Sequence, residues 1–144
     1  MKKKLAGVLY WAVQYTFGLP QNIAGGLMTA FLRLRDRNAR REPFRHAAVT
    51  SWKKDGSMAL GGYLFAGSNA DESVLVHEYG HTLQSLVLGP VYLFAIGLPS
   101  VIWANAPAAA RYRAKKRVRY TSFYPERWAS AFGEKVTGKK AYRK

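Results

Sequence analysis

The sequence contains no cysteine, which excludes disulfide bonds and cysteine-ligated metal sites. Acidic residues are also few, because 8 Asp and Glu stand against 23 Lys and Arg in 144 residues, giving a net charge of +15. Only 3 histidines are present. Any metal site must therefore use a very small set of imidazoles and carboxylates, and their positions in the chain become informative.

Two long stretches lack charged residues altogether, at residues 5–32 and 83–110, and basic residues flank both. A helix needs about 20 apolar residues to cross a hydrocarbon core of about 30 Å, so each stretch is long enough. Glycine and proline interrupt both stretches, at Gly18, Pro20, Gly25, Gly26, Gly89, Pro90, Gly97 and Pro99. Broken apolar helices of this kind fit segments that dip into or lie in one leaflet as well as they fit true spans.

The basic flanks indicate where such segments would lie. Lys and Arg beside apolar segments tend to stay on the cytoplasmic side and are attracted to anionic lipids, each by about 1 kcal/mol. We therefore expect membrane association at the cytoplasmic face, with an anionic membrane surface as partner. The alternative is a soluble cytoplasmic protein whose core helices are these stretches. No Ala-X-Ala site follows the first stretch, so a cleaved signal peptide is not expected.

Residues 77–81 read His-Glu-Tyr-Gly-His, the most informative pattern in the chain. On a helix, His77 and His81 project from one face and can share a metal ion. Neutral imidazoles suit Zn²⁺, which lowers the pKa of bound water to about 7, and Glu78 can accept the proton of that water. The spacing predicts a zinc site for peptide hydrolysis, with a hydrogen-bonded structural pair of histidines as the alternative.

The flanking residues predict the bounds of the motif helix. Asn69 is expected as its N-cap, with Glu72 as the returning partner of a capping box. Gly89 and Pro90 are expected to end the helix. The side of this helix that carries the motif histidines is formed by Val74, His77, His81, Gln84, Ser85 and Leu88.

A third metal ligand must come from outside the motif. Only two carboxylates follow His81, Glu126 and Glu134. Glu126 comes directly after Pro125, a residue typical of the first turn of a helix, and is favoured because His-His-Glu is a catalytic zinc set. Glu134 and His46 remain the alternative third ligands, and a carboxylate that only interacts with the helix dipole is the structural alternative for Glu126.

Two short apolar segments precede the motif helix, at residues 48–52 and 58–65. The Asp-Gly pair at residues 55–56 between them is a strong hairpin signal, so an antiparallel hairpin is expected. The paired glycines at residues 61–62 suggest a bulge or a close backbone approach. An exposed edge of this hairpin can bind an extended peptide as an added strand.

With a glutamate on a later helix, the motif resembles the gluzincin branch of the zincin metallopeptidases, and in particular small bacterial membrane-associated proteins with this motif. The resemblance implies zinc held by His77, His81 and Glu126, with Glu78 as general base. Only the five-residue motif is specific. Many gluzincins have an aspartate four residues after the ligand glutamate, where this chain has Ser130, so the resemblance leaves the partner that orients the histidine unidentified.

These features predict a mostly helical α+β fold with a zincin-like motif helix beside the hairpin. Residues 1–132 are expected to form one metallopeptidase-like domain, and residues 133–144 a basic, flexible tail. The expected substrate is a peptide or protein, cleaved without a covalent intermediate. The candidates for stabilising the oxyanion are His46, Tyr63, Tyr120 and Tyr124.

Two other functions compete with peptide hydrolysis. The first is a membrane structural or accessory protein in which the metal site is structural or inactive. The second is nucleic-acid binding through the basic segments Arg33–Arg45 and Arg111–Lys116, with Tyr112 and Tyr120 stacking on bases. The sequence disfavours this second function, because it has no nucleic-acid motif and its uncharged stretches are too apolar for such a surface.

Overall fold

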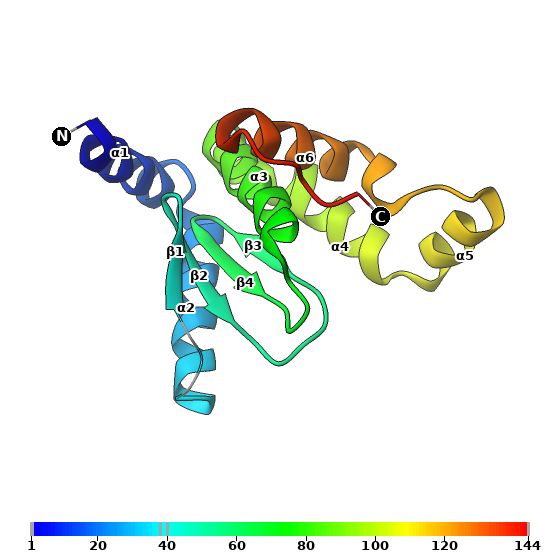
Figure 1. Cartoon of the computed structure of the whole chain (residues 1–144), viewed down its shortest axis with the longest axis horizontal. Helices are drawn as coiled ribbons and strands as arrows, with labels where there is room; N and C mark the ends of the chain where they lie inside the picture. The colour runs from blue at the N-terminus through cyan, green and yellow to red at the C-terminus, as the bar shows by residue number, and fades with distance from the viewer. Residues whose placement is uncertain (1, 38, 40, 144) are drawn as a thin grey trace.

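A computed structural model describes residues 2–37, 39 and 41–143. The chain is 66% helical with one mixed four-stranded sheet, which confirms a mostly helical α+β fold (Figure 1). The α-helices are α1 (Lys2–Thr16), α2 (Leu19–Arg35), α3 (Glu72–Leu88), α4 (Leu98–Asn105), α5 (Pro107–Lys116) and α6 (Tyr124–Thr137). Two short 3₁₀ helices are η1 (Gly89–Val91) and η3 (Tyr120–Ser122), and η2 (Leu93–Gly97) is a short π-helix. The strands are β1 (Arg41–Phe44), β2 (Ala47–Ser51), β3 (Met58–Leu60) and β4 (Tyr63–Ala66).

The sheet has the strand order β1-β2-β4-β3. Strands β1 and β2 pair antiparallel, β2 and β4 pair parallel, and β3 and β4 pair antiparallel. The predicted hairpin between residues 48–52 and 58–65 is therefore wrong, because β4 lies between the two strands that the Asp-Gly turn connects. The glycines at 61–62 form the turn of the β3–β4 hairpin, without a bulge. The predicted close backbone approach is confirmed, because a Cβ on Gly61 would lie 2.5 Å from Asn22 Oδ1 on α2, and the Gly62 amide donates to that oxygen at 2.8 Å.

Helices cover both faces of the sheet. Leu64 and Val49 pack in one cluster with Tyr79 of α3, whereas Tyr63 and Phe65 point to the other face. The α2 residues that pack there are Met28 and Leu32. The alternation follows from the two-residue period of a strand, and it fixes α3 against one face of the sheet and α2 against the other.

Helix α3 begins at Glu72 with Asp71 as its N-cap, whose side chain accepts a hydrogen bond from the Val74 amide at 3.1 Å. The predicted N-cap Asn69 is wrong by two residues, because the Asp71 carboxylate satisfies the free amides of the first turn. The predicted end is confirmed: Gly89 is the C-cap, with a φ of 54°. Only glycine takes that left-handed conformation without strain.

Helices α3 and α6 pack backbone to backbone. A Cβ on Gly80 would lie 1.8 Å from the Ala129 carbonyl oxygen, and one on Gly133 would lie 2.0 Å from that of Val76. No side chain other than hydrogen fits at either position. This close approach brings the first turn of α6 against the histidine-bearing face of α3.

The expected break at residue 133 differs from the structure, in which α6 continues to Thr137 and the chain then returns to α3. The Tyr142 amide donates to the Ser73 carbonyl at 3.0 Å. Lys139 pairs with Glu72 in the first turn of α3. These contacts join residues 133–143 to the rest of the fold.

Within residues 2–37, 39 and 41–143, no single helix has both the length and the hydrophobicity needed to cross a bilayer. Residues Leu93–Asn105 and Pro107–Lys116 meet that requirement only as a pair, and the chain bends by 74° between them.

Candidate metal centre

His77, His81 and Glu126 converge at the contact between α3 and α6. One ligand atom from each lies within 4.8 Å of the others, and all three residues are buried. Glu126 Oε2 lies 3.0 Å from His77 Nε2 and 3.4 Å from His81 Nε2. The structure thus brings together the three residues that the sequence singles out as metal ligands.

The other ring nitrogen of each histidine has its own partner. His77 Nδ1 lies 2.9 Å from Ser130 Oγ on α6. His81 Nδ1 lies 2.7 Å from Gln84 Oε1, and Gln84 Nε2 donates to the Pro125 carbonyl at 2.9 Å. Because that bond fixes the orientation of the Gln84 amide, His81 Nδ1 donates to Gln84 Oε1. His81 Nε2 then carries a second proton toward Glu126 in the charged ring, or a lone pair for a metal ion in the neutral ring.

The sequence alone did not identify these hydrogen-bond partners of the two histidines. Ser130 follows Glu126 by four residues on α6, and its hydroxyl contacts His77 directly. Gln84 lies three residues after His81 on the same helix face, a spacing visible in the sequence, but its role depends on Pro125 of another helix. Both histidines are thereby held with Nε2 toward Glu126.

Glu126 and His81 each change the pKa of the other. Burial raises the pKa of Glu126, but hydrogen bonds from His77 and His81 outweigh it and hold the pKa well below its usual range. Burial lowers the pKa of His81, yet the hydrogen bond to Glu126 and the charge of Glu78 leave it raised overall. Glu126 is therefore an anion, stabilised by the two imidazole rings beside it.

Glu78 is also buried, at 7% exposure, beside the two histidines. Burial raises the pKa of its carboxyl, an effect that the charges of His77 and His81 reduce and that of Glu126 increases. A carboxylate with a raised pKa is a better proton acceptor near neutral pH than an exposed one.

The residues present fit a divalent metal ion. Glu126 Oε1 is buried and has no hydrogen-bond partner among the described residues. Such an unpaired carboxylate oxygen is unfavourable unless a ligand satisfies it. Two imidazole nitrogens and a carboxylate form a donor set that suits Zn²⁺ and leave a fourth position for water.

The cluster opens onto a cleft of about 1370 Å³. Strand β3 forms one wall and α4 another, and the cleft is also lined by His77, Glu78, His81 and Glu126. Strand β3 is an edge of the sheet, since it pairs only with β4 within the described residues. A bound molecule in this cleft can reach both the buried carboxylates and a free strand edge.

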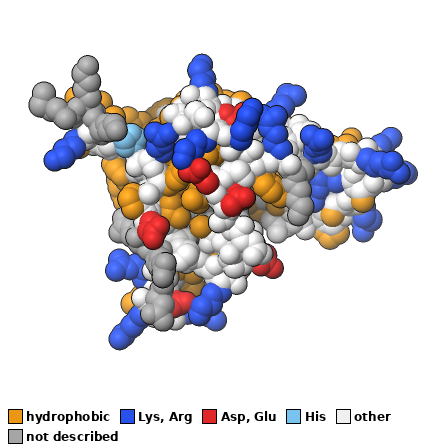
Figure 2. Space-filling model, viewed as in Figure 1, with side chains coloured by type: hydrophobic (Ala, Val, Ile, Leu, Met, Phe, Trp, Pro, Cys, Tyr) orange, Lys and Arg blue, Asp and Glu red, His pale blue; other side chains and the backbone are white. Residues whose placement is uncertain are grey.

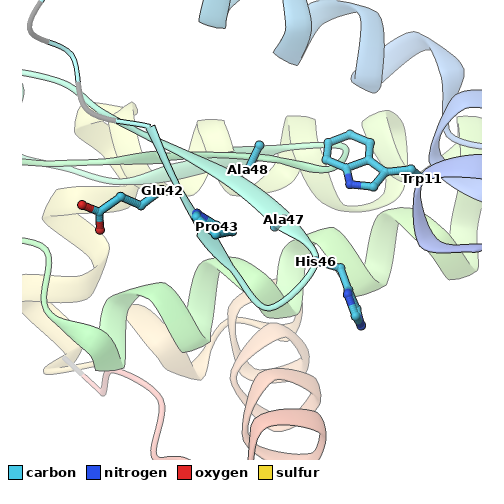
Figure 3. Close-up of a pocket in the computed structure, with 6 residues that line it drawn as sticks. All are labelled: Trp11, Glu42, Pro43, His46, Ala47 and Ala48. Atoms are coloured by element: carbon cyan, nitrogen blue, oxygen red, sulfur yellow. The ribbon is translucent and has the colours of Figure 1, made fainter. Parts of the chain in front are cut away.

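The alternative ligands Glu134 and His46 are not part of this cluster. The Glu134 carboxylate accepts from the Ala141 amide and pairs with Arg143. His46 lies in the turn between β1 and β2, beside a separate pocket of about 310 Å³. Figure 3 shows His46 and Glu42 of that pocket pointing away from each other, so their side chains do not converge on a common point.

Of the four oxyanion candidates, only Tyr120 lines the cleft together with the cluster. The Tyr63 hydroxyl bonds to that of Tyr15 at 2.5 Å, and the Tyr124 hydroxyl donates to the Ala95 carbonyl at 2.6 Å. Burial and the charges of Glu126 and Glu78 raise the pKa of Tyr120, so its hydroxyl keeps its proton and can donate.

Tyr92, which the sequence analysis did not select, also lines the cleft. Burial and the charges of Glu78 and Glu126 raise the pKa of its hydroxyl. No sequence signal separated Tyr92 from the other aromatic residues of the uncharged stretch 83–110.

Comparisons of this chain with protein-family models, with curated proteins and with solved structures gave no match.

Proposed function

We propose that this protein is a zinc-dependent, gluzincin-like hydrolase that cleaves peptide bonds. The observation that carries the proposal is the buried convergence of His77, His81 and Glu126, with an unpaired Glu126 oxygen and Glu78 beside it. A purely structural metal site does not need an adjacent base, whereas hydrolysis does.

The residues of the chain have distinct parts in the proposed reaction. His77, His81 and Glu126 would hold the zinc ion, while Ser130 and Gln84 orient the two rings. When bound, zinc supplies Lewis acidity to a carbonyl oxygen and makes water more acidic.

Glu78 accepts the proton of the attacking water and later delivers it to the leaving amine. The side chain best placed to donate a hydrogen bond to the developing oxyanion is Tyr120, because its hydroxyl stays protonated and lines the same cleft. Tyr120→Phe is expected to lower kcat more than it changes KM, because this donor acts on a charge that forms only during the reaction.

The shape of the cleft supports a peptide as substrate. Strand β3 has a free edge on the cleft, and the motif helix packs against the same strand. An extended peptide can pair with this edge through backbone hydrogen bonds, which do not depend on its side chains. Such pairing would hold a peptide bond beside Glu78 without a dedicated binding domain.

Glu78→Gln tests this function directly, because it removes the base and keeps the size of the side chain. The variant is expected to retain zinc, measured by elemental analysis, and to lose hydrolysis of a quenched-fluorescence peptide library. Retained zinc with unchanged hydrolysis would assign the metal a structural role. A wild-type protein that holds zinc but cleaves no peptide would contradict the proposal for peptides.

A further inference from the structure

Helix α2 buries polar side chains and exposes apolar ones. Its fully buried residues are Gln21, Asn22, Gly25 and Thr29, and the partly buried Met28 and Leu32 pack on the sheet beside them. Its outer face carries an apolar stripe with a spacing of four residues, Leu19, Ile23, Leu27 and Phe31. Leu27 is 67% exposed and Phe31 58% exposed. Exposing this apolar stripe to water is unfavourable, whereas contact of the stripe with lipid acyl chains is favourable.

Helix α1 also buries a polar side chain, next to the aromatic residues Tyr10 and Trp11 that pack in the core. Gln14 is fully buried, and its amide nitrogen donates to the Thr82 carbonyl at 3.2 Å. The Ser85 hydroxyl donates to Gln14 Oε1 at 3.2 Å and accepts from Gln21 at 2.9 Å. The outward residues of α1 are apolar: Leu5, Val8, Leu9 and Val13. Polar side chains thus join α1, α2 and α3 internally, and apolar ones face outward.

Charge indicates which partner, a second copy of the chain or a lipid surface, can cover the outer faces of α1 and α2. No carboxylate occurs in α1 or α2, and the exposed cations at their ends are Lys4, Arg33 and Arg35. A second copy of the chain would carry the same cations and the same net charge of +15, so pairing of identical faces would bring like charges together. An anionic lipid surface complements these cations and covers the apolar stripe at the same time.

Figure 2 supports an overall electrostatic attraction to anionic lipid, because Lys and Arg side chains far outnumber acidic ones on the face it shows. Figure 1 shows α1 and α2 at the end of the molecule away from α5. We propose that the outer faces of α1 and α2 dock into the interface of an anionic bilayer, with Ile23, Leu27 and Phe31 inserted among the acyl chains. This docking is independent of whether the metal centre is active.

Single-cysteine labelling can test the docking site by site, because the chain has no native cysteine. Leu27→Cys, labelled with an environment-sensitive fluorophore, is expected to shift to shorter wavelength with vesicles of equal parts phosphatidylglycerol and phosphatidylcholine. Brominated acyl chains in those vesicles should quench it. The matched control is Val136→Cys, which is also half exposed but lies on α6, and its emission should not change.

Vesicle sedimentation of unlabelled protein gives a second, quantitative test. The triple variant Ile23→Ser, Leu27→Ser and Phe31→Ser is expected to partition onto these vesicles at least about tenfold more weakly than the wild type, given the apolar surface removed. Val136→Ser should partition like the wild type. Because all these side chains are exposed, the variants should fold, as circular dichroism can verify.

Three results would overturn the proposal. The first is unchanged partitioning of the triple variant. The second is equal binding of the wild type to phosphatidylcholine vesicles and to the anionic ones, which would remove the role of charge. The third is a wild-type protein that does not bind vesicles but forms a dimer, or binds an acidic protein, through a contact that the triple variant abolishes.

Discussion

Two groups of buried polar side chains include residues of α3, one together with α1 and α2 and the other with α6, and they differ in charge. Gln14, Gln21 and Ser85 are neutral and bond to one another and to backbone carbonyls. The metal-centre group is ionisable, and its Glu126 retains an unpaired buried oxygen. Each group keeps one buried oxygen without a hydrogen-bond partner among the described residues, Gln21 Oε1 in the first and Glu126 Oε1 in the second. Only the second oxygen belongs to an ionised group, which lies beside two imidazoles.

This difference separates a structural from a functional use of buried polarity. Neutral amides and hydroxyls that bond to each other hold three helices together. Ionisable groups buried with an unpaired oxygen are costly unless they bind something. Substitutions in the two groups should therefore affect different measurements, which are zinc content and hydrolysis for the metal-centre group and the free energy of unfolding for the neutral group.

Removing a ligand should have the largest effect. His77→Ala, His81→Ala and Glu126→Ala are each expected to lose stoichiometric zinc and all hydrolysis, because each leaves two protein ligands. Elemental analysis after purification without added metal measures this. If Glu126→Ala keeps zinc at the wild-type ratio, the third ligand has been assigned to the wrong residue.

Removing the base should separate binding from chemistry. Glu78→Gln is expected to reduce kcat about 100-fold or more while zinc content stays at one ion per chain. Steady-state kinetics and elemental analysis on the same preparation provide both numbers. Equal loss of zinc and activity would make Glu78 a metal-site residue instead of a base.

Separating the helices should weaken both stability and metal binding. Gly80→Ala places a Cβ against the Ala129 backbone, and forcing α3 and α6 apart is expected to lower the free energy of unfolding by about 3 kcal/mol. Denaturant unfolding measures this loss. The control is Gly56→Ala, because a Cβ there meets nothing within 4 Å, and its midpoint should stay close to that of the wild type.

Removing the hydrogen-bond partner of the His81 ring should weaken zinc binding without abolishing it. Gln84→Ala removes the acceptor of His81 Nδ1 and is expected to weaken zinc binding about 10- to 100-fold. Competition with a chelator of known affinity measures this change. Zinc affinity identical to that of the wild type would show that the Gln84 contact does not orient the ring.

A substitution in the neutral group of Gln14, Gln21 and Ser85 should have the smallest effect on stability and should not change zinc binding. Ser85→Ala removes a partner of Gln14 and Gln21 and is expected to lower the free energy of unfolding by about 1 kcal/mol, with unchanged zinc content. The exposed Ser122→Ala serves as its control in denaturant unfolding. Zinc loss in Ser85→Ala would contradict the separation of the two groups.

Local signals predicted the motif helix and its end well, since the spacing of His77 and His81 and the conformation of Gly89 depend only on nearby residues. A small sheet beside this helix was predicted, but its four strands and its mixed topology were not. The Asp-Gly turn indicates a reversal of direction, but the parallel pairing of β2 with β4 depends on residues that are distant in sequence and on α2 packing against them. Strand β1 was missed because its sequence is polar and contains a proline.

The metal centre was partly accessible to sequence reasoning because the chain offers so few ligands. Glu126 was selected by the scarcity of carboxylates and by its position in a first helical turn, and the structure places it beside the histidines. The glycines that permit this contact were not recognised. Gly80 lies inside the motif, and only the position of Ala129 on another helix shows why a side chain is not tolerated there.

The most direct test of the metal centre is an anomalous-difference map at the zinc absorption edge, from crystals of protein grown without added chelator. We predict one peak between His77 Nε2, His81 Nε2 and the Glu126 carboxylate, about 2.0 to 2.2 Å from each ligand atom. A well-ordered structure with no peak there, and with Glu126 bonded directly to both histidines, would contradict the central claim that these residues hold a metal ion.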